Sequence, residues 1–156
     1  MIAYGKPVIG VIGASRPSGK GYELARAVGR NIAERGGIVV CGGLGGVMEA
    51  ACRGAKEGGG LTIGILPGQD AAEANRFVDV PIVTGMGYAR NIIIVRTAQA
   101  IVALDGSFGT LSELAHALQM AKPLVAVGCR IAPPDVPQVE DPEEAVARAF
   151  AACADR

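Results

Sequence analysis

Short apolar runs alternate with helical patterns along most of this chain. The first run, residues 7–13 (PVIGVIG), is rich in β-branched side chains and predicts a buried strand. In residues 20–35 apolar side chains recur at every fourth position, which predicts an amphipathic helix, and the pair Gly36-Gly37 ends it. The chain therefore begins with a strand that is followed by a helix.

The rest of the chain continues this alternation of strand and helix, with a few irregular segments between the elements. Residues 69–76 are polar and alanine-rich and predict a loop or short helix, and Pro81 interrupts an extended pattern at residues 77–84. Pro133, Pro134 and Pro137 mark an irregular segment, after which Asp141-Pro142-Glu143-Glu144 opens a last helix with proline at its first position. The other predictions are strands at residues 38–41, 61–66, 100–104 and 124–127, and helices at 46–57, from about 88, and at 108–121.

This order of elements predicts the fold class. Strands and helices that alternate at these lengths form a mostly parallel sheet covered on both faces, and right-handed crossovers arrange them in three layers. We therefore predict an α/β fold, a three-layer Rossmann-like domain. A chain of 156 residues is long enough to bury one core, so we expect a single domain over residues 1–156.

The amino-acid composition limits the classes of partner that this protein is expected to bind. Lysine plus arginine equals aspartate plus glutamate at 15 each, so we expect no nucleic-acid partner whose binding depends on neutralising a phosphate backbone. Three tyrosines and three phenylalanines, without a basic aromatic face, also argue against a single-strand DNA-loading protein. No apolar run approaches the length of a membrane span, so no membrane partner is expected.

The cysteines indicate a reducing compartment. Cys41, Cys52, Cys129 and Cys153 show no C-x-x-C spacing, and the N-terminus does not resemble a signal peptide. We therefore expect a cytoplasmic protein with reduced thiols, each of them a small buried apolar side chain.

Three strand-to-helix turns are rich in glycine, and such turns gather at the edge of a parallel sheet where ligands bind. The first turn, residues 13–19 (GASRPSG), matches neither the G-x-G-x-x-G fingerprint nor the P-loop. Either Ser15, Arg16 and Ser18 line a site, or the turn is an ordinary solvated one.

The second turn (GGLGG) contains four glycines immediately before a helix. Uncovered backbone N–H groups at a helix start suit an anion, which predicts a phosphate-sized site at the N–H groups of residues 43–47. Alternatively, glycine is required for positive φ or close packing, which we expect for one or two of the four. The residues concerned are Gly42, Gly43, Gly45, Gly46, Val47 and Met48.

The third turn, residues 105–113 (DGSFGTLSE), again leads from a strand to a helix. Its glycines and hydroxyl groups and the N–H groups of residues 109–111 predict a second phosphate-sized pocket. Glu113 lies one turn inside the helix, where its carboxylate can reach sugar hydroxyl groups or a developing positive charge. Two other interpretations compete: Glu113 completes a T-x-x-E capping box with Thr110, or Ser107 is the cap. Spacing alone favours a capping role over catalysis.

His116 follows Glu113 at the E-x-x-H spacing of helical metal ligands. Because no second carboxylate cluster accompanies this pair, we interpret His116 as a helix-surface histidine and predict no metal site.

Five segments of the chain are similar to motifs of one family: GGLGGVMEA (42–50), GG (59–60), IGILPG (63–68), RN (90–91) and GSFGTLSE (106–113). They resemble the "possible lysine decarboxylase" family, which includes molybdenum-cofactor carrier proteins and cytokinin-activating nucleoside monophosphate phosphoribohydrolases. The resemblance runs in order from Pro7 to Val127. It implies a Rossmann-like fold, obligate oligomers and a phosphate-bearing ligand between two glycine loops.

The hydrolases of that family typically contain P-G-G-x-G-T-x-x-E and an upstream Arg-Lys pair. The resemblance matches Arg90 to the catalytic arginine and Glu113 to the catalytic glutamate. Asn91, however, stands where lysine is usual, and Asp105 and Ser107 replace the proline and the second glycine. These departures remove a positive charge and add a carboxylate, so we expect weaker binding of a dianionic phosphate. The short chain and the G-x-F-G-T-L-S-E form look more like the carrier branch.

The resemblance thus implies a protein that binds a phosphorylated pterin, of the molybdopterin type, or a nucleotide. A carrier requires no cofactor for chemistry, and the molybdenum cofactor is then a bound ligand. The alternative is a phosphoribohydrolase that releases the base from a nucleoside 5′-monophosphate, and only then are Arg90 and Glu113 catalytic. The expected ligand-binding residues are Gly13, Ser15, Gly42, Gly43, Gly45, Gly46, Val47, Met48, Arg90, Asn91, Gly106, Ser107, Phe108, Gly109, Thr110 and Glu113.

The helix near Tyr88 also predicts self-association. Residues 92–95 (IIIV) are four consecutive apolar residues, which point to every side of a helix. Packing on one sheet covers only part of them. We therefore expect a homo-oligomer, a dimer or tetramer, with a helix-on-helix contact that brings Arg90 close to a neighbouring subunit.

Overall fold

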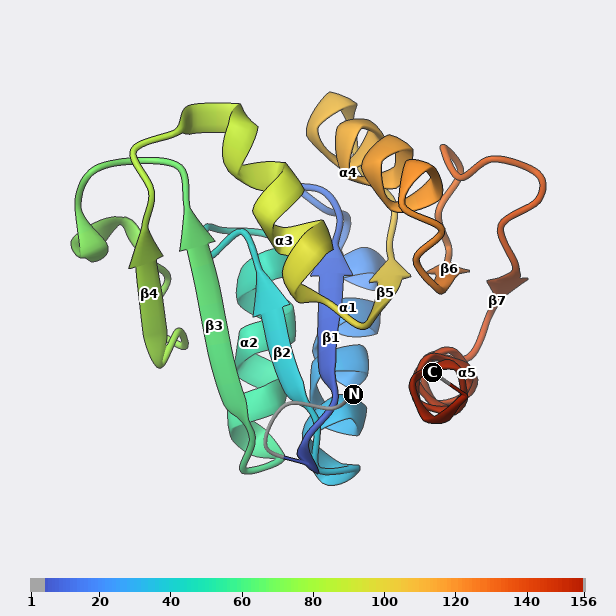
Figure 1. The fold of residues 1–156 in the computed structure, drawn as a ribbon. Coiled ribbons are helices and arrows are strands. Elements are labelled where there is room, and N and C mark those ends of the chain that lie inside the picture. The colour runs from blue at the N-terminus through green and yellow to red at the C-terminus, as the bar shows by residue number, and fades with distance from the viewer. Residues whose placement is uncertain (1–4, 156) are drawn as a thin grey trace.

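A computed structural model describes residues 5–155 as one seven-stranded sheet between two layers of helices (Figure 1). The strand order is β4-β3-β2-β1-β5-β6-β7, and every neighbouring pair is parallel. The predicted three-layer, Rossmann-like fold is confirmed.

The elements lie close to their predicted positions. The strands are β1 (Val8–Ile12), β2 (Ile38–Cys41), β3 (Leu61–Leu66), β4 (Val80–Val83), β5 (Ala100–Ala103), β6 (Leu124–Val127) and β7 (Gln138–Val139). The helices are α1 (Gly19–Glu34), α2 (Val47–Glu57), α3 (Asn91–Thr97), α4 (Phe108–Gln119) and α5 (Pro142–Ala154), with short 3₁₀ helices at Ala71–Glu73 and Gly87–Arg90.

Local signals end α1 and begin α5 as predicted. At the end of α1, Gly36 takes a φ of 79°, and the N–H of Gly37 donates to the carbonyl of Ile32 at 2.9 Å. At the start of α5, the Asp141 carboxylate accepts a hydrogen bond from the N–H of Glu143 at 3.1 Å. Both boundaries follow from residues next to one another in the chain.

The sheet separates two clusters of buried apolar residues. Helices α1, α2 and α5 cover one face, here called the back, and α3 and α4 cover the other, here called the front (Figure 1). No helix in the described part of the chain is long and apolar enough to cross a membrane.

Both edges of the sheet differ from the predicted pattern. At one edge, Pro81 lies inside β4, where it pairs with Gly64; an edge strand tolerates a residue without an N–H. At the other edge, the proline-rich segment contains the strand β7, which we did not predict. The side-chain amide of Gln138 donates to the carbonyl of Cys129 at 2.8 Å and accepts from its N–H at 3.1 Å. A two-residue strand has no periodicity from which to predict it.

The strand order reverses between β1 and β5, and this position determines where the site lies. The chain builds outward from β1 to β4 on one side and from β5 to β7 on the other. In such sheets ligands bind at the crevice outside the carboxyl ends of the two strands at the switch point. The two loops that bound this crevice are joined by a hydrogen bond from the N–H of Ala14 to the carbonyl of Asp105 at 2.8 Å.

Candidate functional site

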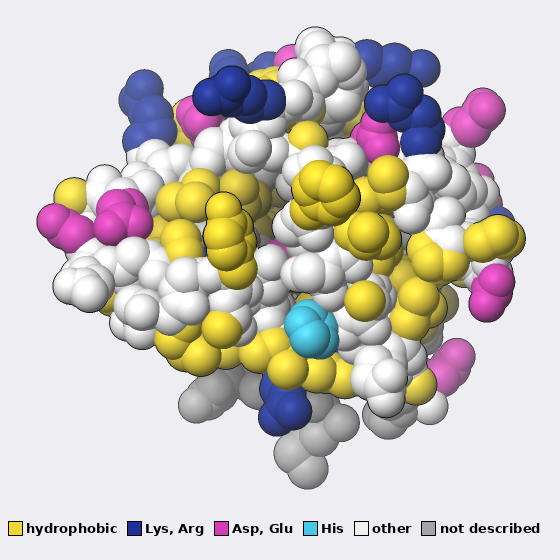
Figure 2. Space-filling view, turned by 90° about the horizontal axis from the view of Figure 1, so that it is seen from above, with side chains coloured by type: hydrophobic (Ala, Val, Ile, Leu, Met, Phe, Trp, Pro, Cys, Tyr) yellow, Lys and Arg dark blue, Asp and Glu magenta, His cyan; other side chains and the backbone are white. Residues whose placement is uncertain are grey.

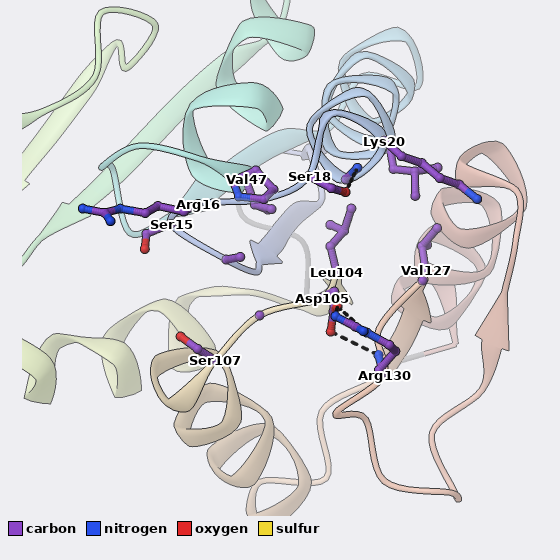
Figure 3. Close-up of a pocket in the computed structure, with 16 residues that line it drawn as sticks. Ser15, Arg16, Ser18, Lys20, Val47, Leu104, Asp105, Ser107, Val127 and Arg130 are labelled. Carbon is purple, nitrogen blue, oxygen red and sulfur yellow. Dashed lines mark hydrogen bonds and ion pairs between the residues drawn. The ribbon is translucent and has the colours of Figure 1, made fainter.

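Two adjoining cavities open at this crevice. The front chamber, about 570 Å³, is lined by residues of α3 and α4, and the back chamber, about 810 Å³, by residues of α1 and the loop after β6. Ser15 and Ser107 line both chambers and lie on opposite sides of the crevice (Figure 3). Both volumes are typical of small-molecule sites.

The start of α4 presents unpartnered hydrogen-bond donors to the front chamber. Ser107 is the N-cap, and its hydroxyl makes no capping bond. Among the described residues, the N–H groups of Phe108, Gly109 and Thr110 have no partner, and all three residues line this chamber. A side chain at Gly106 would place its Cβ 2.1 Å from Thr110 Oγ1, so this turn requires glycine. Three free N–H groups at the positive end of a helix suit a phosphate.

Glu113 faces this chamber and is not part of a capping box. Because Ser107 holds the N-cap position, Thr110 lies inside the helix, and the predicted Thr110 box is wrong. The alternative, Ser107, has the position of the cap but makes no capping bond. Glu113 is only 7% exposed, and no hydrogen bond from the described residues reaches its carboxylate. Burial raises the pKa of Glu113 to about 7, although the charge of Arg90 acts in the opposite direction.

Arg90 lies beneath the second glycine loop with its guanidinium fixed. Its Nε donates to the carbonyl of Ile65 at 2.8 Å, and its Nη2 lies 3.4 Å from the carbonyl of Gly42. A Cβ on Gly42 would lie 2.6 Å from Nη2, so the close approach requires glycine. Arg90 is 7% exposed, and burial lowers its pKa, while the charge of Glu113 raises it. Two buried ionisable side chains, Arg90 and Glu113, therefore line the front chamber, and each affects the pKa of the other.

Asn91 holds this arginine in place. Its side-chain oxygen accepts a hydrogen bond from Arg90 Nη1, and its side-chain nitrogen donates to Ser112 Oγ at 3.1 Å. Asn91 thus connects the guanidinium to α4. Asn91 stands where the hydrolases have the lysine of their Arg-Lys pair. In this structure it positions Arg90 and adds no positive charge.

The glycines of the second loop serve packing more than we expected. Gly42 leaves room for the side chain of Arg90. Gly43 and Gly46 take positive φ values of 77° and 69°. A Cβ on Gly46 would also lie 2.4 Å from the carbonyl oxygen of Ala14. Of the four, Gly45 alone has open space around it. Three of the four glycines are therefore explained by backbone conformation or close approach, where we predicted one or two.

The same loop offers fewer free donors than predicted. The N–H of Val47 donates to the carbonyl of Ala14 at 2.9 Å, and the N–H of Gly43 donates to Cys41 Sγ at 3.4 Å. The Cys41 thiol also lies 3.5 Å from the Cys52 thiol. All four cysteines are buried, as expected, but this pair additionally anchors the loop. The N–H groups of Leu44, Gly45 and Gly46 have no partner among the described residues, but of these three residues only Leu44 lines a chamber. At the α4 start, all three residues with free donors line the front chamber.

The first loop and Asp105 line the back chamber. Ser18 caps α1, since its hydroxyl accepts a hydrogen bond from the N–H of Gly21 at 3.1 Å. Asp105 forms an ion pair with Arg130, whose Nη2 lies 2.7 Å from its carboxylate (Figure 3). The negative charge that we expected to weaken phosphate binding is thus paired.

The structure brings most of the predicted residues together. Those that line the front chamber are Gly13, Ser15, Met48, Arg90, Asn91, Ser107, Phe108, Gly109, Thr110 and Glu113. Val47 and Gly106 line the back chamber, and the four glycines of the second loop line neither. His116 is half-buried on α4 and lines neither chamber, and no three His, Cys, Asp or Glu residues cluster within residues 5–155.

Sequence reasoning missed several lining residues. Leu44, Tyr88 and Ser112 complete the front chamber, and Lys20 and Arg130 are the missed cations of the back chamber. Arg130 follows the carboxyl end of β6, so the rule that ligands bind at strand ends could have identified it. Tyr88 is 88% exposed, a property that no local pattern reveals.

Comparison with known proteins places these features in a family. The model of the SLOG cluster4 family matches residues 6–152. The structure of the molybdenum cofactor binding protein from Rippkaea orientalis is 35% identical, with a TM-score of 0.87 over 96% of this chain and 98% of that one. The molybdenum cofactor carrier protein of Chlamydomonas reinhardtii is 36% identical, with a TM-score of 0.85 over 96% and 99%.

A hydrolase is also similar to part of the chain. The cytokinin riboside 5′-monophosphate phosphoribohydrolase of Mycobacterium marinum is 36% identical over 99 residues, which are 59% of this chain and 51% of the hydrolase. The similarity therefore spans about half the length of that relative.

Proposed function

Because this chain belongs to the SLOG cluster4 family, we propose that it binds a phosphorylated small ligand, in the manner of a molybdenum-cofactor carrier. The observation that supports this most directly is the set of three unpartnered N–H groups at the start of α4. They would receive the phosphate, and the ligand's ring would occupy the front chamber. A molybdopterin-type cofactor is the preferred ligand, since two relatives that align over nearly their whole length are named for that cofactor.

The mouth of the front chamber suits a planar ring. Tyr88 and Phe108 both line it and are 88% and 89% exposed. Large aromatic side chains in water present ring faces on which a pterin or purine can stack. Aromatic stacking together with fixed phosphate donors provides affinity without any chemical step.

The second candidate function is hydrolysis of a nucleoside 5′-monophosphate. A specific observation favours it: Glu113 is a buried carboxyl with a pKa raised to about 7 beside a buried arginine. In this mechanism Arg90 would hold the phosphate, and the Glu113 carboxylate would stabilise the oxocarbenium-like ribose while water attacks the sugar. The hydroxyl group of that water would remain on the ribose carbon, and its proton would leave with the base.

Removing one donor from α4 tests the phosphate site. Phe108→Pro deletes the N–H at the first helical position, where proline is tolerated, and Ser107 already has the extended backbone that precedes proline. We expect this variant to bind AMP and inorganic phosphate about 10-fold more weakly than Phe108→Ala, because one hydrogen bond to a charged group is lost. Calorimetry measures both affinities.

The Ala variant is the matched control, since it also lacks the aromatic ring but keeps the N–H. Equal affinities of the two variants would contradict the phosphate site, and the absence of phosphate and AMP binding in the native protein would contradict the proposed function. Chromatography of the same AMP samples separates the candidates: a carrier leaves AMP intact, whereas a hydrolase releases free base.

Self-association stays a prediction, and it is supported by helix α3, whose apolar side chains are only partly covered. On α3, Ile94 and Val95 are buried, but Ile92 and Ile93 are only half-buried. Leu118 on the adjoining α4 is 45% exposed, and apolar side chains gather over the front of the carboxyl edge (Figure 2). We therefore propose a subunit contact through the front layer.

Light scattering tests this contact. We expect a dimer or tetramer of the 15.8 kDa chain that Leu118→Asp dissociates, because a buried unpaired carboxylate disfavours the interface. Ala151→Asp adds the same charge at an exposed position of α5, on the back layer, and should leave the assembly intact. A native protein that scatters as a monomer would refute the contact.

A further inference from the structure

The back chamber is larger than the front one and is not needed by a ligand with a single phosphate. The front chamber alone, at about 570 Å³, is within the usual range for a small ligand. The back chamber adds about 810 Å³ on the other side of Ser15 and Ser107. A mononucleotide or a phosphorylated pterin in the front chamber would leave this second volume to solvent.

The back chamber has an apolar floor and a basic rim. Leu24, Leu104 and Val127 line its interior. Lys20 lies on one side and the Asp105–Arg130 ion pair on the other, with Leu104 and Val127 between them (Figure 3). Among the described residues that line this chamber, Asp105 carries the only carboxylate, and it is already paired with Arg130.

This leaves an excess of positive charge at the back chamber. Within residues 5–155, Lys20 makes no ion pair or hydrogen bond, so its charge is not compensated by that part of the protein. Figure 2 shows Lys and Arg side chains along the back of the carboxyl edge, whereas apolar side chains prevail toward the front. A ligand that fills this chamber would combine an apolar ring with a negative group.

The position of the two chambers defines how such a ligand would lie. They adjoin at the crevice between the carboxyl ends of β1 and β5, the switch point across which parallel α/β sheets bind two-part ligands. Ser15 and Ser107 mark their boundary and offer hydroxyl groups from both sides. Phosphates that join two ring systems would therefore pass between these serines.

We propose that the back chamber binds the second half of a pyrophosphate-linked dinucleotide, with its base on the apolar floor and its second phosphate next to Lys20. This proposal rests on the proposed function, because the first phosphate is placed at the start of α4. It identifies the ligand class as one with two ring systems and at least two phosphates. A mononucleotide then occupies the front chamber only.

Calorimetry with AMP and with diadenosine pyrophosphate tests the proposal. We expect the native protein to bind diadenosine pyrophosphate at least about 10-fold more tightly than AMP, because a second charged contact and a second buried ring are added. Lys20→Glu should remove most of this gain and change the affinity for AMP less than about two-fold.

Lys6→Glu is the matched control, because it makes the same change of charge at an exposed lysine beside a cavity outside both chambers. It should leave both affinities unchanged. If AMP binds but diadenosine pyrophosphate binds no better, or if Lys6→Glu weakens it as much as Lys20→Glu does, the back chamber is not a subsite, although the proposed function stands. If neither nucleotide binds, this inference fails, and the Phe108 variants with inorganic phosphate judge the proposed function separately.

Discussion

Glu113→Gln is expected to stabilise the folded protein at pH 8 by up to about 3 kcal/mol. Burial without a hydrogen-bond partner among the described residues raises the pKa of this carboxyl from 4.5 to about 7. At about 1.36 kcal/mol per pH unit, the difference between these two pKa values corresponds to about 3 kcal/mol of destabilisation once the carboxyl group ionises. Glutamine has nearly the same shape and no charge, so this cost disappears.

The effect has a definite dependence on pH. Below pH 4.5 the carboxyl is protonated in the folded and unfolded states, so it costs no stability. Between pH 4.5 and pH 7 only the unfolded state loses the proton, and the stability of the native protein falls relative to that of the variant. Above pH 7 both states are ionised, and the difference is constant.

Urea denaturation at pH 5 and pH 8 measures this difference. Glu140→Gln, at an exposed position, is the control and should show no comparable change with pH. A stability difference between native protein and Glu113→Gln that is equal at the two pH values would contradict the buried carboxyl.

The same variant bears on function. A buried carboxyl that lowers stability at neutral pH is the kind of feature that persists because a site uses it. In a carrier, Glu113→Gln should preserve or strengthen phosphate binding, because it removes a negative charge from the chamber. In a hydrolase it should abolish base release while AMP still binds.

Gly54→Ala is expected to lower the free energy of unfolding by about 3 kcal/mol. Helices α1 and α2 approach each other at two glycines: a Cβ on Gly54 would lie 1.8 Å from the carbonyl oxygen of Arg26, and one on Gly29 would lie 1.9 Å from that of Ala51. Both neighbours are backbone atoms, so no side-chain rotation relieves the overlap. Overpacking that forces backbone shifts costs about 1–3 kcal/mol and occasionally more.

Urea denaturation followed by circular dichroism measures this loss. Gly19→Ala is the control, because Gly19 is also a helical glycine of α1, but a methyl group there would have nothing within 4 Å of it. In the absence of a clash, alanine favours a helix over glycine by up to about 1 kcal/mol, so this variant should lose no stability. A loss below about 1 kcal/mol in Gly54→Ala would show that the helices can separate without cost.

Much of the candidate site was predictable because its backbone parts are local. A glycine-rich turn between a strand and a helix predicts a helix N-terminus, and the parallel order of the strands brings such turns to one edge. Ser15 and the start of α4 at Phe108 therefore lie at the predicted edge, whereas Asn91 was expected there from the family resemblance. What each side chain does there was less predictable. Asn91 fixes an arginine and Asp105 pairs with Arg130, and neither partner could be chosen from spacing alone.

The sequence by itself determined the order along the chain of the helices and of every strand except β7, the parallel sheet and the edge where its glycine turns meet, because periodicity and chain breaks are properties of neighbouring residues. Only the tertiary structure decided that α4 begins after Ser107, so that Glu113 takes no part in a capping box. It also decided that Gly42 lies against Arg90, 48 residues later in the chain, where a side chain would not fit. It also decided that a second, basic chamber adjoins the first. Contacts between distant segments depend on how whole elements pack, and burial, which sets the pKa of Glu113, exists only after they have packed.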